Sequence, residues 1–208
     1  MTSIWGPLGW MTIHSMASLY PDEPSQAEQQ LMRSWLDLFK GTITCPSCQA
    51  HFTEQLDAYR ARFPQMLESR ASFLMFTFRV HNSVNHRLHK PIYNTVAECF
   101  AVLQNNVKLR SATQYRQAYY QHITRHWKMM QDASGISALR KIAEMHKIEA
   151  SYAAPRSDDF SVLIPEGLTS LGLIQKTSED VQPRTMMPQA PHDQRRMGIV
   201  AGRFRLRK

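Results

Sequence analysis

The sequence lacks the features of a membrane protein and of a secreted, disulfide-rich protein. No stretch approaches the ~20 consecutive apolar residues of a membrane span, and the N-terminus has neither the basic nor the apolar segment of a secretory signal. Only three cysteines occur in 208 residues, too few for the several disulfides that stabilise a small secreted domain. Because 43% of the residues are hydrophobic, we expect a soluble domain of ordinary size followed by a tail.

Acidic residues are missing from the C-terminal end. Residues 195–208 contain no Asp or Glu and account for most of the formal net charge of +8. Their basic residues are Arg195, Arg196, Arg203, Arg205, Arg207 and Lys208. Such a segment can bind nucleic acid, an anionic membrane or another acidic surface, or it can simply keep the protein soluble. The sequence leaves these alternatives open.

Apolar residues recur at helical spacing, as in Leu31, Trp35, Leu38 and Phe39, which predicts an all-α fold. The expected helices cover about 7–20, 25–40, 44–63, 69–89 and 95–103, with a break near residues 105–106 and more helix over 111–148. Beyond residue 151, prolines and glycines become frequent, and we expect a partly disordered arm whose apolar runs at 160–164 and 168–174 dock on the body.

The most informative feature is the pair in Cys45-Pro-Ser-Cys48. Thr44 is the expected N-cap of the third helix, which would place both cysteines in its first turn. Two thiols at this spacing can close a disulfide without backbone movement, and a helix N-terminus favours a thiolate. The pair therefore predicts redox or metal chemistry.

Other uses of a Cys-x-x-Cys motif have to be weighed. A thioredoxin-like fold would place the motif after a β-strand, whereas the flanks here are helical. A c-type haem site requires His directly after the second cysteine, where this chain has Gln49. A zinc site built on Cys45, Cys48 and His51 is the strongest alternative. Its fourth ligand would be His81, His86 or His89.

The fourth predicted helix carries a polar stripe. His81 and Asn85 are one turn apart, with Asn82 and Val84 beside them, so they would face a common groove that suits a flat polar heterocycle. Asn offers both a donor and an acceptor to such a ring, and Lys90 could neutralise a pyrophosphate.

Two residues of the first predicted helix, Trp10 and His14, are also one turn apart, with Tyr20 nearby, and could stack on a ring. Taken singly, each of these residues is more simply explained by core packing or solvation.

Together these motifs resemble the Erv/ALR family of FAD-linked thiol oxidases. The matching residues are Trp5-Gly-Pro-Leu-Gly-Trp10, His14, Ala17, Tyr20-Pro21, the cysteine pair with His51-Phe52, Arg70, Phe73, His81-Asn-Ser-Val-Asn85, Leu88 and Lys90-Pro91. The resemblance covers residues 3–95, less than half of the chain. It implies a four-helix bundle with a short fifth helix, commonly a homodimer.

The resemblance also implies roles for single residues. Cys48 would lie next to the flavin, and Cys45 would exchange with a substrate dithiol. No metal site is implied. The residues expected to line FAD are Trp5, Trp10, His14, Tyr20, His51, His81, Asn82, Val84, Asn85, Leu88, Lys90 and Tyr93. The aromatic residue that closes the adenine end would be Tyr115, Tyr119 or Tyr120, with Lys108 or Arg116 beside it.

The implied reaction passes electrons from a dithiol protein through the cysteine pair to FAD and then to dioxygen, giving hydrogen peroxide. Family members often have a shuttle disulfide, which is absent here, so a separate dithiol protein, such as a thioredoxin-like carrier, is expected to dock at Cys45. A structural disulfide common in the family is also missing, with Phe78 and Thr95 at its positions. Cys99 is then left over, and we expect it to be buried and inert.

Three segments are expected: an FAD-binding core at 1–105, a helical extension at 106–150 and the basic arm at 151–208. The minimal form resembles the enzymes of large DNA viruses, which implies the host cytoplasm and the virion as compartments, with the mitochondrial intermembrane space as the alternative. Two other functions stay open. One is a zinc-stabilised helical binding protein, and the other is a virion scaffold protein with a nucleic-acid-binding tail.

Overall fold

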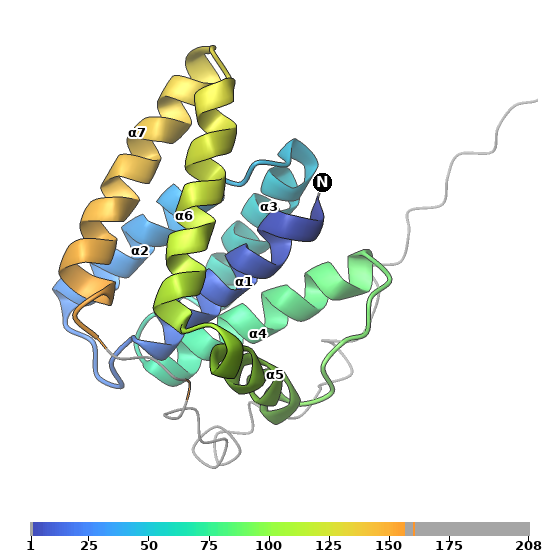
Figure 1. Ribbon diagram of the computed structural model, residues 1–208. Helices are drawn as coiled ribbons and strands as arrows, with labels where there is room; N and C mark the ends of the chain where they lie inside the picture. The colour runs from blue at the N-terminus through green and yellow to red at the C-terminus, as the bar shows by residue number, and fades with distance from the viewer. Residues whose placement is uncertain (1, 157–159, 161–208) are drawn as a thin grey trace, which may run out of the picture. The chain divides into compact units, whose positions relative to one another are not determined.

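A computed structural model describes residues 2–156 and residue 160, and all regular secondary structure in this part of the chain is helical (Figure 1). The α-helices are α1 (Thr2–Ser18), α2 (Gln26–Lys40), α3 (Pro46–Arg62), α4 (Arg70–Arg87), α5 (Val96–Leu109), α6 (Ala112–Met129) and α7 (Ala133–Ile148), followed by a π-helix at Glu149–Ala153. The predicted all-α class is confirmed. No helix in this part is long and apolar enough to cross a membrane.

The start of α3 corrects one prediction. The N-cap is Cys45 and not Thr44, with Pro46 as the first helical residue. A residue before proline is driven out of the helical region by steric clash, and Cys45 accordingly has φ −103° and ψ 112°. Its sulfur accepts a hydrogen bond from the backbone N–H of Cys48 at 3.3 Å.

Three other helix limits differ from the predictions. The first helix begins at Thr2, ahead of Pro7, and the break predicted near residues 105–106 is wrong because α5 continues to Leu109. The stretch 111–148 is two helices, since Asp132 caps α7 by accepting from the N–H of Gly135 at 2.9 Å. A Cβ on Gly135 would lie 2.0 Å from the carbonyl oxygen of Met130, so this tight turn requires glycine.

Helix α1 lies at the centre of the packing, against α4 and α6, and α7 packs on α6 and α2. The largest fully buried side chains include Trp35, Tyr20, Tyr119, Tyr120, Phe73 and Phe76. Phe39 of α2 stacks on Tyr119 of α6, with ring centroids 5.3 Å apart. The predicted segment limit at 105–106 falls inside α5, and the helices that follow it contribute to the same core as α1 and α2.

Part of the predicted C-terminal arm is ordered against this core. Phe160, the first residue of one apolar run, is fully buried, and its carbonyl accepts from Gln104 Nε2 at 3.1 Å. The rest of that run, the second run at 168–174 and the basic segment 195–208 lie outside the described residues.

A buried ion pair joins the later helices to α1. The guanidinium of Arg116 is fully buried, and its Nε donates to both carboxylate oxygens of Glu149 at 3.0 Å. Its other nitrogens donate to the hydroxyls of Ser15 and Thr113. One side chain thereby connects α6 to the π-helix and to α1.

We predict that Arg116→Ala lowers the free energy of unfolding by about 3–5 kcal/mol, because it leaves the Glu149 carboxylate buried without a partner. Lys147→Ala is the matched control. It breaks the Lys147–Glu144 pair, whose side chains are 72% and 54% exposed, and should cost no more than about 0.5–1 kcal/mol. Urea denaturation measures both, and equal losses would contradict the assigned role of Arg116.

Candidate active site

The cysteine pair lies beside a cavity of about 520 Å³ whose lining comes from α1, α3, α4, α5, α6 and the segment that joins α4 to α5. Cys48 lines this cavity, together with most residues predicted to hold the cofactor. These are Trp5, Trp10, His51, His81, Val84, Asn85, Leu88, Lys90 and Tyr93. Residues far apart in the sequence are therefore brought to one site by the packing of α1, α3 and α4.

Cys45 and Cys48 form a disulfide, with Cα atoms 5.2 Å apart. Only Cys48 is part of the cavity lining. Pro46 and Ser47, between them, are exposed to solvent. The side chain of Gln49 donates to the carbonyl of Lys40 at 3.1 Å and so fixes the start of α3 to the end of α2. With each sulfur bonded to the other, this pair has no thiolates to offer a zinc ion.

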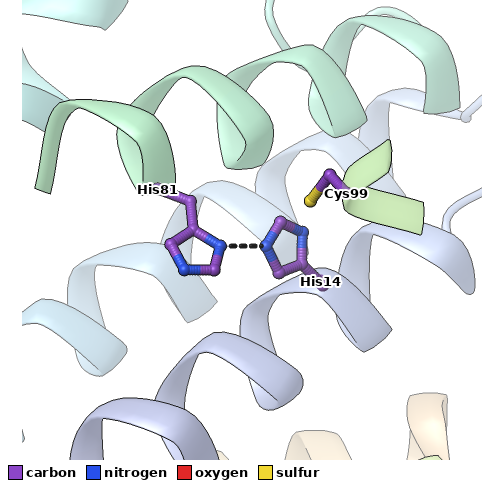
Figure 2. Close-up of side chains that lie close together, drawn as sticks. All are labelled: His14, His81 and Cys99. Atoms are coloured by element: carbon purple, nitrogen blue, oxygen red, sulfur yellow. Dashed lines mark hydrogen bonds between the residues drawn. The ribbon is translucent and has the colours of Figure 1, made fainter. Parts of the chain in front are cut away.

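Trp10 and His81 form a stacked pair within the cavity wall, with ring centroids 4.1 Å apart and planes inclined by 10°. Tyr93 meets the His81 ring edge-on at 5.5 Å. Behind this wall, His81 Nδ1 and His14 Nε2 share a hydrogen bond of 3.0 Å, as Figure 2 shows. The bond joins α4 to α1, and His14 is completely buried.

Both histidines are neutral at physiological pH. Burial, with the neighbouring His81 adding to it, holds the pKa of His14 well below its ordinary value. Burial and then the charge of Lys90 lower the pKa of His81 to about 3. One nitrogen of the pair therefore donates and the other accepts, and this wall of the cavity carries no charge.

Cys99 lies next to the two histidines (Figure 2). Among the described residues, these three are the one group of potential metal ligands, with the ligand atoms within 4.8 Å of one another. Burial raises the pKa of the Cys99 thiol to about 12, so the sulfur is protonated at neutral pH. The prediction that Cys99 is buried is confirmed.

Three residues predicted to hold the cofactor lie outside the cavity lining, and two of them, Asn82 and His14, support it from behind. The side-chain amide of Asn82 makes two hydrogen bonds to the main chain of Tyr93, each 2.9 Å long. It accepts from the N–H and donates to the carbonyl oxygen. His14 lies behind His81, as described. Tyr20 points elsewhere, because its hydroxyl donates to the carbonyl of Leu67 at 2.8 Å and its ring packs edge-on against Phe73.

Sequence reasoning missed several lining residues. Arg87 lies one helical turn after Val84 and adds a second cation to the lining, close to Lys90 in the sequence. Its spacing from Val84 could have predicted that it faces the cavity. Val102, Leu103 and Asn106 of α5 also line the cavity, as do Gly6, Pro7, Met11, Phe52 and Pro91. Their positions depend on how the helices pack and could not be read from spacing alone.

The structure distinguishes among the three tyrosines of α6. Tyr115 lines the cavity, with the guanidinium of Arg110 5.5 Å from its ring centroid. Tyr119 and Tyr120 are buried in the core. Arg116 is committed to Glu149, and Lys108 bonds to Asn105 at 3.0 Å.

Comparison with known proteins gives a consistent result. The model of the Erv1 / Alr family matches residues 8–125. The chain is 34% identical over 88 residues to protein 096R of Invertebrate iridescent virus 3, covering 42% of this chain and 58% of the relative. It is 35% identical over 92 residues to protein 347L of Invertebrate iridescent virus 6, covering 43% and 83%. Both relatives are named as FAD-linked sulfhydryl oxidases.

A cellular relative carries the same description. The chain is 28% identical over 100 residues to FAD-linked sulfhydryl oxidase ERV2 of Saccharomyces cerevisiae, covering 48% of this chain and 47% of the relative. The chain thus spans about half of the length of the yeast protein and 58% of 096R. No solved structure matches it.

The neutral histidine pair predicts how stability depends on pH. The unfolded chain binds a proton at each histidine below about pH 6.5, whereas the folded chain does not, so stability is complete above about pH 6.5 and falls as the pH is lowered. Each histidine contributes up to about 1.4 kcal/mol per pH unit. The free energy of unfolding therefore changes with pH between about pH 6 and pH 4.5, and His14→Gln should make this change smaller by about that amount per pH unit.

Urea denaturation at several pH values measures this slope. His86→Gln is the control, since His86 is an exposed residue of α4. An unchanged slope in the His14 variant would show that His14 is not held neutral by the fold.

Proposed function

This chain belongs to the Erv1/Alr family, and from that premise we propose that it is an FAD-linked sulfhydryl oxidase that forms disulfide bonds in a partner dithiol. One observation carries the proposal. Cys48, one half of a disulfide at the start of a helix, lines a cavity whose wall is the neutral Trp10–His81 stack. The names of the viral and yeast relatives support the same activity.

The residues present fit a flavin dinucleotide. A volume of about 520 Å³ lies in the range of cofactor sites. The uncharged aromatic wall suits a planar ring, and the amide of Asn85 can both donate to it and accept from it. Arg87 and Lys90 supply positive charge for two phosphates.

We assign the parts of the cofactor accordingly. Trp10, His81 and Cys48 would hold the ring system, Arg87 and Lys90 the pyrophosphate, and Tyr115 would close over the adenine. When bound, FAD supplies two-electron chemistry that connects a dithiol to dioxygen, with hydrogen peroxide as the product. The protein supplies the exchange disulfide and an uncharged wall.

The exchange begins at Cys45, because Cys48 is turned toward the cavity. A substrate thiolate attacks the sulfur of Cys45, the Cys45–Cys48 bond breaks, and Cys48 leaves as a thiolate. The second substrate thiolate then attacks the substrate sulfur of the mixed disulfide and releases Cys45 as a thiolate. The substrate has lost two electrons and gained a disulfide, and the cysteine pair has gained both electrons.

The start of α3 favours both leaving groups. Helix N-termini carry partial positive charge, and the backbone N–H of Cys48 already points at the sulfur of Cys45. A thiolate at either cysteine is therefore stabilised, which speeds the breaking of a bond to that sulfur. Because Cys48 lines the cavity, its thiolate forms next to the proposed cofactor site, to which the electrons pass from the cysteine pair.

We propose that the physiological substrate is a separate dithiol protein, such as a thioredoxin-like carrier. The three cysteines of the chain include no second Cys-x-x-Cys pair that could serve as a shuttle. We further propose a homodimer, a basic segment at 195–208 that contacts nucleic acid or another acidic surface, and the host cytoplasm or the virion as the compartment. The viral relatives support this compartment over the mitochondrial intermembrane space.

We predict that Cys48→Ser abolishes oxygen uptake driven by dithiothreitol, a loss of at least about 100-fold, because no disulfide remains to receive the electrons. Cys99→Ser is the control and should keep most of the activity, since Cys99 lies in the core and outside the cavity lining. An oxygen electrode measures both variants. Normal uptake by the Cys48 variant would refute the proposed exchange.

A further inference from the structure

The turn between α6 and α7 presents apolar side chains to solvent. Met129 is 77% exposed, Ile136 is 55% exposed and Met130 is 44% exposed. These three residues, here called the turn patch, lie at the end of the α6–α7 hairpin, at the top of Figure 1. Such a cluster of large exposed apolar residues is typical of an interaction surface.

The hairpin is fastened to the loop that leads into the active site. Trp127, two residues before Met129, donates from Nε1 to the carbonyl of Thr42 at 2.9 Å. The hydroxyl of Thr42 in turn contacts the sulfur of Met145 in α7 at 3.8 Å. Thr42 is three residues from Cys45, so their Cα atoms are at most about 11 Å apart. The hairpin is therefore attached to the chain three residues before the cysteine that meets the substrate.

A partner that covers Cys45 with one edge of its contact area can also cover the turn patch. A stable protein contact buries about 800 Å² on each side, which corresponds to a footprint about 16 Å in radius. The route from Cys45 to Met129 consists of the three residues to Thr42, one hydrogen bond, the Trp127 side chain and two further residues. It is longer than this radius, but a footprint that has Cys45 toward one edge can include Met129.

The surroundings of the turn patch are basic. Between residues 117 and 143 the chain has four cationic side chains, Arg125, Lys128, Arg140 and Lys141, and a single acidic residue, Asp132. Asp132 is occupied in capping α7. Arg125 lies one helical turn from Met129, and Arg140 one turn from Ile136, so an arginine flanks the patch on each helix.

This hairpin is an addition to the common family domain. The family match ends at residue 125, within α6, whereas Trp127, the turn patch and α7 all follow it. The features that fasten the hairpin near Cys45 are thus separate from the shared cofactor site.

We propose that the turn patch and its two arginines form the docking surface for the protein whose dithiol reacts at Cys45. The complementary partner carries an apolar side chain flanked by acidic residues close to its two cysteines. The proposal rests on the proposed oxidase function and names the chemistry of its substrate. Apolar contact with the patch supplies affinity, and the arginines speed the encounter with acidic partners.

The test uses two synthetic dithiol peptides as probes. Both contain Cys-Gly-Pro-Cys and a nearby leucine, and they differ in carrying three glutamates or three lysines around that leucine. With the wild-type protein, we expect kcat/KM from oxygen uptake to be about tenfold higher for the acidic peptide, with the preference shrinking at high salt. Arg125→Glu/Arg140→Glu should abolish or reverse this preference, and Met129→Ser/Ile136→Ser should lower kcat/KM for the acidic peptide severalfold.

The control changes one cation and one apolar residue in the last turn of α5, just before the start of α6. Lys108→Glu/Leu109→Ser alters exposed side chains, Leu109 being 87% exposed. The 18 residues of α6, about 27 Å of helix, separate this site from the turn. This variant should keep the wild-type preference.

Dithiothreitol separates the two proposals. It needs no docking surface, so all these variants should oxidise it at the wild-type rate. If the wild-type protein does not oxidise dithiothreitol, the oxidase function is refuted. If it does, and the peptide preference is the same in every variant, the docking surface is refuted. The docking proposal is equally overturned if the patch variants change the oligomeric state in sedimentation experiments and leave the preference intact, since the patch would then join two copies of the chain.

Discussion

The hydrogen bond between His14 and His81 is the interaction on which the site depends. It joins α1 to α4, the two helices that supply the aromatic wall of the cavity, and it lies in a part of the core with no water-exposed surface at His14. A proton on either ring would place a charge there, so burial keeps both rings neutral. The stack of Trp10 on His81 and the edge contact of Tyr93 follow from the position of the His81 ring. An uncharged planar wall next to Cys48 is the result.

Much of this arrangement could be predicted from local patterns. The helical spacing of His81 and Asn85 and the placement of the cysteine pair at a helix start are short-range features, and the structure has both of them. Helical spacing alone predicts Cys45 in the first turn, and Pro46 moves it out of the helix because a residue before proline avoids the helical region. That effect makes Cys45 the N-cap and gives its sulfur the N–H of Cys48.

What could not be predicted depends on tertiary packing. Three tyrosines of α6 were equal candidates for the cavity, and only the rotation of α6 against α1 decides that Tyr115 faces it while Tyr119 and Tyr120 enter the core. Tyr20 has the aromatic character expected of a cofactor contact, yet its hydroxyl donates a hydrogen bond to the carbonyl of Leu67 and so does not face the cavity. Arg116 is a plausible cation for the adenine site by its spacing alone, yet in the structure it binds Glu149 and holds the π-helix in place.

The central claim is that electrons pass from a dithiol through Cys48 into a cofactor held in the adjoining cavity. The most direct measurement is anaerobic mixing of the purified protein with dithiothreitol while the flavin absorption band is followed. The wild-type protein should be yellow and should bleach on mixing, and the Cys48→Ser variant should be equally yellow and keep its colour. A colourless wild-type protein, or a Cys48→Ser variant that bleaches as fast as the wild type, would contradict the account.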